Sequence, residues 1–214
     1  ASTRSGQVSG NAAAPGGPEG RQDARLDARH RYKLLGDCRE LVLGRLSALV
    51  GRALEQINRS LADEALALER GERKRGLLDT VLMLRQHRRA IEQNFRRVFG
   101  NLFERRLFSQ PAAAAGAETH LPEIARLAAR VRSNLDPAEG RAIRIALGAL
   151  LEREPFDDAR DPVAPELVFE ALQAGVVDAS SQAVDRLVWE ALAEAFEPHL
   201  SRELGGVYRE LNSR

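Results

Sequence analysis

The stretch LLDTVLMLRQHRRAIEQNFRRVFGNL, from Leu77 to Leu102, decides the fold of this chain. Every third or fourth residue belongs to one seam, and seven of its eight positions are apolar: Leu77, Val81, Leu84, Arg88, Ile91, Phe95, Val98 and Leu102. This heptad spacing predicts a long amphipathic helix. Four further arginines, Arg85, Arg89, Arg96 and Arg97, lie off the seam, where charged side chains belong on a solvated or partner-facing side.

A helix from Leu77 to Phe108 would be roughly 48 Å long and could not bury its own apolar stripe. A second stripe of this kind occupies the preceding segment, at Leu35, Cys38, Val42, Leu46, Leu49, Ala53 and Ile57. We expect a break at Asn58–Ser60, with Ser60 capping a further turn or two, and a charged turn at Glu69–Gly76. The two stripes would then face each other in a long antiparallel helical hairpin.

Three glycines of the first stripe, Gly36, Gly44 and Gly51, recur at spacings of eight and seven. This spacing puts them on one side of the helix, where they would let a neighbouring helix approach closely. Neutral drift would leave the same pattern.

The rest of the chain also favours helices. Hydrophobic residues make up 43% of it but aromatic residues only 5%, and runs of β-branched residues are few. We expect helices that begin at Pro122, at Pro137 with Asp136 as the cap, and at Pro165, and a final long helix capped by Ser180 or Ser181. The predicted fold class is all-α, a helical hairpin followed by a smaller helical bundle.

The composition divides the chain into four parts. Residues 1–23 read as a disordered tail or linker, because they are rich in Gly, Ala, Ser and Pro and have no apolar period. Residues 24–108 form the hairpin and residues 109–122 a linker containing Pro111 and Gly116. Residues 123–214 form the smaller bundle.

Charge separates the two helical parts. Residues 21–106 contain 20 Arg or Lys against 12 Asp or Glu, a net charge of +8, whereas residues 107–214 contain 11 against 18, a net charge of −7. One explanation is that the halves lie against each other and compensate. The other is that the basic half docks an external acidic partner.

Arg88 stands out because it places a guanidinium at a seam position. We expect it to reach the edge of the interface or to pair with an acid such as Glu40 or Glu55. The alternative is an anion contact between helices. Together with its neighbours it forms the candidate interaction face: Arg85, Arg88, Arg89, Arg96 and Arg97.

Two pairs of segments resemble an uncharacterised proteobacterial family. RYKLLGDCRELVLGRLSALV and LRQHRRAIEQNFRRVFGNLFERRL are similar to its early helix and its arginine-rich run, and DPVAPELVFEALQ and VYRELN to its Asn-Pro-Leu-Ser-Pro box and closing Tyr. In that box this chain has Asp161, Val163 and Ala164. The family is catalogued as domain of unknown function number 1631 and is sometimes labelled thymidine phosphorylase-like. The resemblance covers about Arg29 to Asn212 and implies no established catalytic residue.

No enzyme signature accompanies the helical pattern. The sequence lacks the paired histidines of zinc proteases, nucleophile elbows, Walker loops and dinucleotide-binding glycines, as well as the glycine loop and α/β pattern that a thymidine phosphorylase needs. The acidic cluster Asp157, Asp158 and Asp161 lacks the remaining positions of a calcium loop, which favours a solvated linker. We therefore expect no cofactor, no metal site and no small-molecule substrate.

Three functions stay open. The preferred one is a non-enzymatic scaffold or regulatory module that binds a protein partner or associates with itself. The second is nucleic-acid or nucleotide binding through the arginine-rich hairpin, which the poor interleaving of aromatic residues disfavours. The third is an enzyme of an unfamiliar kind.

The expected compartment is the cytoplasm. The single cysteine, Cys38, excludes an internal disulfide framework and is expected to be a small buried hydrophobe. No run approaches the roughly 20 apolar residues of a membrane span, and the first residues do not resemble a signal peptide. Because the chain begins with Ala and stops without a closing element, we expect a fragment of a longer bacterial protein.

Overall fold

The computed structural model describes residues 18–108, 122–157, 161–180 and 185–214, and within these ranges it consists of six α-helices and no strand. The predicted all-α fold is therefore confirmed. The helices are α1 (Pro18–Ala67), α2 (Glu72–Phe108), α3 (Pro122–Ser133), α4 (Pro137–Leu150), α5 (Pro165–Ser180) and α6 (Arg186–Asn212).

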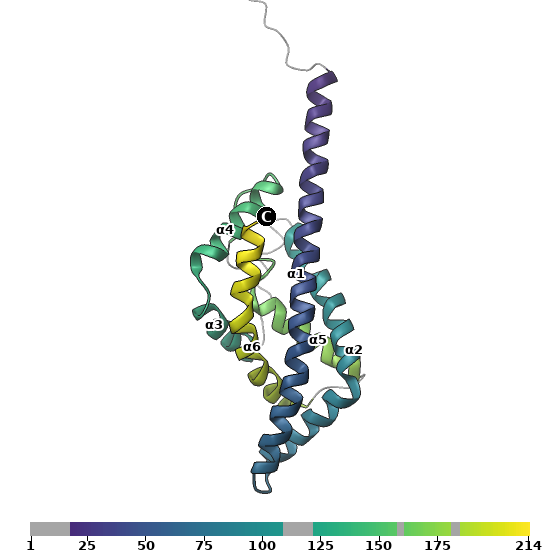
Figure 1. Cartoon of the computed structure of the whole chain (residues 1–214), viewed down its shortest axis with the longest axis vertical. Coiled ribbons are helices and arrows are strands. Elements are labelled where there is room, and N and C mark those ends of the chain that lie inside the picture. The colour runs from purple at the N-terminus through teal and green to yellow at the C-terminus, as the bar shows by residue number, and fades with distance from the viewer. Residues whose placement is uncertain (1–17, 109–121, 158–160, 181–184) are drawn as a thin grey trace, which may run out of the picture.

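The two longest helices, α1 and α2, pack against each other and are joined by a four-residue turn, which confirms the helical hairpin. The turn is shorter than the predicted Glu69–Gly76, because α2 already begins at Glu72. In Figure 1, α1 is a single rod whose first turns extend beyond the other helices. It begins at Pro18, six residues before the expected start, and the predicted break at Asn58–Ser60 is wrong. Ile57 and Leu61 are both buried on the hairpin side, so packing holds this segment in the helix while Ser60 faces water.

The buried face of α2 follows the predicted seam only up to Phe95. Beyond Ile91 the buried residues recur every fourth position, at Ile91, Phe95, Phe99, Phe103 and Leu107. Val98 and Leu102 of the predicted seam are only partly buried. A step of four residues rotates the stripe by about 40° around the helix. Three helices, α1, α5 and α6, pack against α2, so its buried face does not have to follow the single seam of a two-helix hairpin.

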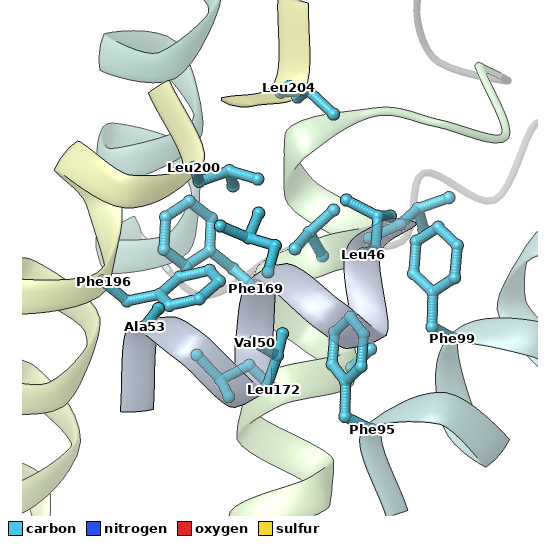
Figure 2. Packing of buried hydrophobic residues seen from close by; sticks show 14 of the residues in the cluster. Leu46, Val50, Ala53, Phe95, Phe99, Phe169, Leu172, Phe196, Leu200 and Leu204 are labelled. Atoms are coloured by element: carbon cyan, nitrogen blue, oxygen red, sulfur yellow. The ribbon is translucent and has the colours of Figure 1, made fainter. Parts of the chain in front are cut away.

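The helix α5 packs mainly on α2 and much less on α6, so the second half of the chain shares one core with the hairpin. Figure 2 shows side chains of α1, α2, α5 and α6 meeting in this core. Phe169 of α5 lies edge-on to Phe196 of α6, with ring centroids 5.9 Å apart, and Phe95 stacks on Phe99 at 5.7 Å. Offset and edge-on geometries of this kind stabilise aromatic pairs beyond their buried area.

Close approach of α5 to α2 occurs at a glycine that the sequence did not single out. A Cβ on Gly175 would lie 3.1 Å from the backbone nitrogen of Phe95 and 3.2 Å from the carbonyl oxygen of Ile91. Of the two explanations for the regularly spaced glycines, the structure supports neutral drift at Gly36 and Gly44, because nothing lies within 4 Å of a Cβ at either position. At Gly51 the neighbour is only the flexible side chain of Glu92.

The predicted starts of the shorter helices are confirmed in three cases and wrong in one. Helices α3, α4 and α5 begin at Pro122, Pro137 and Pro165, and the carboxylate of Asp136 accepts from the backbone N–H of Ala138 at 2.8 Å. The final helix, however, is capped by Asp185, whose carboxylate accepts from Leu187 at 2.7 Å. Ser180 ends α5, and Ser181 lies outside the described residues, as do residues 1–17 of the expected tail and residues 109–121 of the expected linker.

Candidate functional site

Three of the five arginines of the candidate interaction face have carboxylate partners within the chain. Arg88 lies 3.7 Å from Glu55 and 3.4 Å from Glu92, which matches the pairing expected for this seam position. Arg96 lies 3.5 Å from Glu40 of α1, and Arg97 lies 2.6 Å from Asp178 of α5. The charge on this part of α2 is thus largely balanced by acids of the neighbouring helices.

Arg85 and Arg89 differ from these three. Both are exposed, and neither has a carboxylate within ion-pair distance among the residues that the structure describes. They are four residues apart on one helix, so their Cβ atoms lie about 6 Å from each other on the same side. Two guanidinium groups therefore face solvent side by side, with no counter-ion from the described part of the chain.

These two arginines continue a line of exposed leucines. Leu78 is 45% and Leu82 54% exposed, and the spacing of four, three and four residues puts Leu78, Leu82, Arg85 and Arg89 on one side of α2. We call these four residues the α2 stripe. Apolar side chains followed by cations on one helical face suit a partner that carries apolar and acidic groups in the same order.

A hollow of about 300 Å³ lies beside the α2 stripe, lined by Asn58 of α1 and by Leu84, Arg85, Gln86, Arg88 and Arg89 of α2. The side-chain oxygen Oδ1 of Asn58 is buried and has no hydrogen-bond partner within the described part of the chain. A buried acceptor without a donor is unfavourable by about 1–3 kcal/mol. The hollow thus combines unpaired cations with an unpaired acceptor.

Elsewhere the basic and acidic halves of the chain pair with each other. Arg45 lies 2.5 Å from Glu210, Arg52 lies 2.5 Å from Glu203, and Arg31 pairs with Glu152. These pairs support the explanation that the halves compensate each other. Most of them are exposed, so each contributes no more than about 1 kcal/mol to stability.

A buried polar cluster was not predicted. Asp161, expected in a solvated linker, is only 5% exposed. Its carboxylate accepts from the backbone N–H of Val163 at 2.8 Å and lies 3.3 Å from a guanidinium nitrogen of Arg144 in α4. Burial raises the pKa of this carboxyl, against the opposing effects of the Val163 hydrogen bond and of Arg144. The linker prediction is therefore wrong at Asp161, whereas Asp158 of the same cluster lies outside the described residues.

The same cluster contains a second ion pair and a buried tyrosine. Arg132 of α3 donates twice to Glu166 of α5, at 2.5 and 2.6 Å, and the Tyr208 hydroxyl of α6 donates to the carbonyl oxygen of Val163 at 3.2 Å. Burial also raises the pKa of Tyr208. The cluster ties four helices, α3 to α6, to the segment before α5. Its groups bond to each other, and we interpret it as structural.

A second hollow, of about 370 Å³, is mostly apolar and lies between α1, α4 and the end of α6. Its lining includes Leu34, Cys38, Ile143, Leu147 and Leu211. Cys38 is half-buried, and burial followed by the charge of Asp37 raises its thiol pKa, with Arg214 acting in the opposite direction. The thiol stays protonated at neutral pH, consistent with the expected role as a small hydrophobe.

The remaining titratable groups do not converge. Within the described ranges no group of three or more His, Cys, Asp or Glu residues is placed to hold a metal ion. Burial and the charge of Arg202 lower the pKa of His199, and Glu203 opposes this shift. No helix in the described part of the chain is both long enough and apolar enough to cross a bilayer.

The fold and the site together define a class: an all-α protein built on a long helical hairpin, in which α2 presents two exposed arginines, Arg85 and Arg89, that have no carboxylate partner among the described residues. The chain belongs to the family described as protein of unknown function (DUF1631), N-terminal domain, whose model matches residues 30–214. This confirms the resemblance seen in the sequence. No curated protein and no solved structure matches the chain.

Proposed function

We propose that this chain is a protein-binding module of a scaffold or regulatory protein, and that the α2 stripe docks an acidic amphipathic helix of a partner. The observation that carries the proposal is the contrast within the arginine face. Arg88, Arg96 and Arg97 are occupied by Glu55, Glu92, Glu40 and Asp178, whereas Arg85 and Arg89 are left to solvent.

The neighbouring leucines favour a protein over a nucleic acid as the partner. Leu78 and Leu82 expose about half of their surface directly before the two arginines. An amphipathic helix can cover both leucines with its own apolar residues and place carboxylates on the arginines. A nucleic acid would use the cations and leave the leucines exposed, and aromatic stacking residues are absent from the stripe. Nucleic-acid binding is kept as the alternative because unpaired arginines also attract phosphodiesters.

The test is affinity capture with the purified chain from the cytosol of its source, after nuclease treatment. We expect proteins that the wild type retains to be lost with L78S/L82S and with R85E/R89E. They should be retained by R141E, because Arg141 is an exposed arginine of α4 that has no carboxylate partner among the described residues. Capture that disappears with nuclease would establish the alternative. Equal capture by all four proteins would refute docking at the α2 stripe.

A further inference from the structure

We propose that the hollow beside the α2 stripe is a phosphate subsite, which takes the phosphomonoester of a phosphorylated segment in the docked partner. This inference rests on the proposed function and adds the chemistry that the docking face recognises. Its elements are the guanidinium groups of Arg85 and Arg89, with Arg88 at the edge, and the carboxamides of Gln86 and Asn58.

The number of unpaired donors favours a phosphate over a carboxylate. One carboxylate saturates one guanidinium through two parallel hydrogen bonds. Arg85 and Arg89 offer two such groups one helical turn apart, and a phosphomonoester, with three acceptor oxygens and nearly two negative charges, can engage both. Arg88 contributes less, because Glu55 and Glu92 already hold it at 3.7 and 3.4 Å.

The exposed leucines of the α2 stripe indicate that the anion is attached to a peptide. Leu78 and Leu82 are 45% and 54% exposed on the same side of α2 as Arg85 and Arg89. A bare anion would leave both leucines in contact with water, whereas a phosphorylated amphipathic segment can cover them with its own apolar residues. The volume of about 300 Å³ is at the lower end of the range for ligand sites and suits a single phosphorylated side chain.

Two acids near the hollow, Glu55 and Glu92, determine how much positive charge is available to a ligand. Glu55 pairs with Arg59 as well as with Arg88, and Glu92 with Arg88, so neither needs to move when Arg85 and Arg89 bind an anion. The positive charge available to a ligand is that of the two unpaired arginines, which matches the charge of one phosphomonoester.

The experiment uses the full chain and three amphipathic peptides that differ at one position, phosphoserine, serine or glutamate, placed one turn after two leucines. We expect fluorescence anisotropy to show at least tenfold tighter binding of the phosphoserine peptide than of the serine peptide, with glutamate in between. R85Q/R89Q should remove this preference and R141Q should keep it. R85K/R89K should retain only part of it, because lysine keeps the charge without the planar fork.

Equal binding of the three peptides would overturn the phosphate subsite while leaving the proposed docking of leucines intact. Loss of all peptide binding only in L78S/L82S would likewise support docking without the subsite. A duplex oligonucleotide or inorganic phosphate that displaces the phosphopeptide at equal concentration would also overturn it, because the site would then recognise phosphate without the peptide. Circular dichroism confirms that each variant folds, which the exposure of the exchanged side chains leads us to expect.

Discussion

The hydroxyl of Tyr208 donates a hydrogen bond to the backbone carbonyl of Val163, 3.2 Å away, and both residues are buried. This contact joins the two segments on which the resemblance of the second half rests, DPVAPELVFEALQ and VYRELN, which lie 45 residues apart at this point. The sequence alone does not show that the two segments meet. In the structure, Tyr208 of the second segment supplies the donor for the buried carbonyl oxygen of Val163 in the first.

Replacing Tyr208 by Phe tests this contact. We expect the variant to lose about 1–3 kcal/mol of unfolding free energy, because the ring stays in place but the buried carbonyl oxygen of Val163 loses its donor. The measurement is urea denaturation of wild type and variant. The matched control is Tyr32→Phe at the only other tyrosine, which is 67% exposed and should leave stability unchanged. Equal effects at both sites would contradict the assignment.

Asp161 predicts a pH dependence. Its pKa in the folded chain lies above the usual value, so between about pH 4 and that raised pKa the folded state binds more protons than the unfolded state. In this window the contribution of Asp161 to stability decreases as pH rises, and above it the contribution is constant. We therefore expect the wild type to become more stable relative to Asp161→Asn as the pH is lowered from 7 towards 4. The measurement is the difference between their unfolding free energies. A difference that stays flat or reverses over this range would contradict the raised pKa.

Two glycines predict substitutions of opposite sign. Gly175→Ala should destabilise the fold by about 1–3 kcal/mol, since the added Cβ would meet the backbone of Phe95 and Ile91 at 3.1–3.2 Å. Gly44→Ala should stabilise it by about 0.5–1 kcal/mol, because the position is helical and open. Thermal denaturation of the two variants gives the comparison. A Gly175→Ala protein as stable as the wild type would mean that α5 does not approach α2 so closely.

The core of the hairpin predicts unequal costs for two nearby residues. Phe95→Ala should lower the free energy of unfolding by about 3–5 kcal/mol, because Phe95 of α2 is 0% exposed and lies in the core that α2 shares with α1, α5 and α6. Arg97→Ala should cost less than about 0.5 kcal/mol, although Arg97 pairs with Asp178, because that pair is exposed to solvent. Chemical denaturation measures both values. Similar losses would mean that the buried face of α2 is assigned to the wrong side.

The thiol of Cys38 is expected to react slowly with alkylating reagents. Because burial raises its pKa, the reactive thiolate is a small fraction at neutral pH. We expect alkylation by iodoacetamide at pH 7.5 to be at least several-fold slower than that of free cysteine, and its rate to keep rising at a pH where free cysteine has levelled off. Unfolding in urea should remove the difference. A rate equal to that of free cysteine in the native protein would contradict the half-buried position.

The sequence predicts where most helices lie along the chain, but not which helices pack against each other. Periodicity and proline positions locate α2 and the starts of α3, α4 and α5, since these depend on local residues. The drift of the buried stripe from Val98 to Phe99 could not be predicted, because it depends on α5, which lies about 70 residues further along the chain. Asp185 rather than Ser180 or Ser181 caps α6, and several residues here are good caps, so local preference does not decide among them.

For the candidate site, too, the sequence indicates the residues but not their partners. The five arginines were identified from their positions off or on the seam, but their sequence does not show that Asp178 and Glu40 occupy two of them. Asp161 can be buried because Arg144 of α4 and the backbone N–H of Val163 both contact its carboxylate, and the first of these contacts cannot be predicted from the local sequence. An acidic run such as Asp157, Asp158 and Asp161 has the composition of a solvated linker, and the burial of Asp161 is visible only in the three-dimensional arrangement.

The packing of α5 across α2 also has a consequence for synthesis on the ribosome. The last residue of α2 is Phe108 and the last of α5 is Ser180, so about 70 residues must be added before the surface at Ile91 and Phe95 can be covered. At ~5–20 residues per second this takes roughly 4–14 s. We expect the nascent hairpin to expose part of its phenylalanine face throughout this interval, which makes it a substrate for chaperones that bind apolar segments.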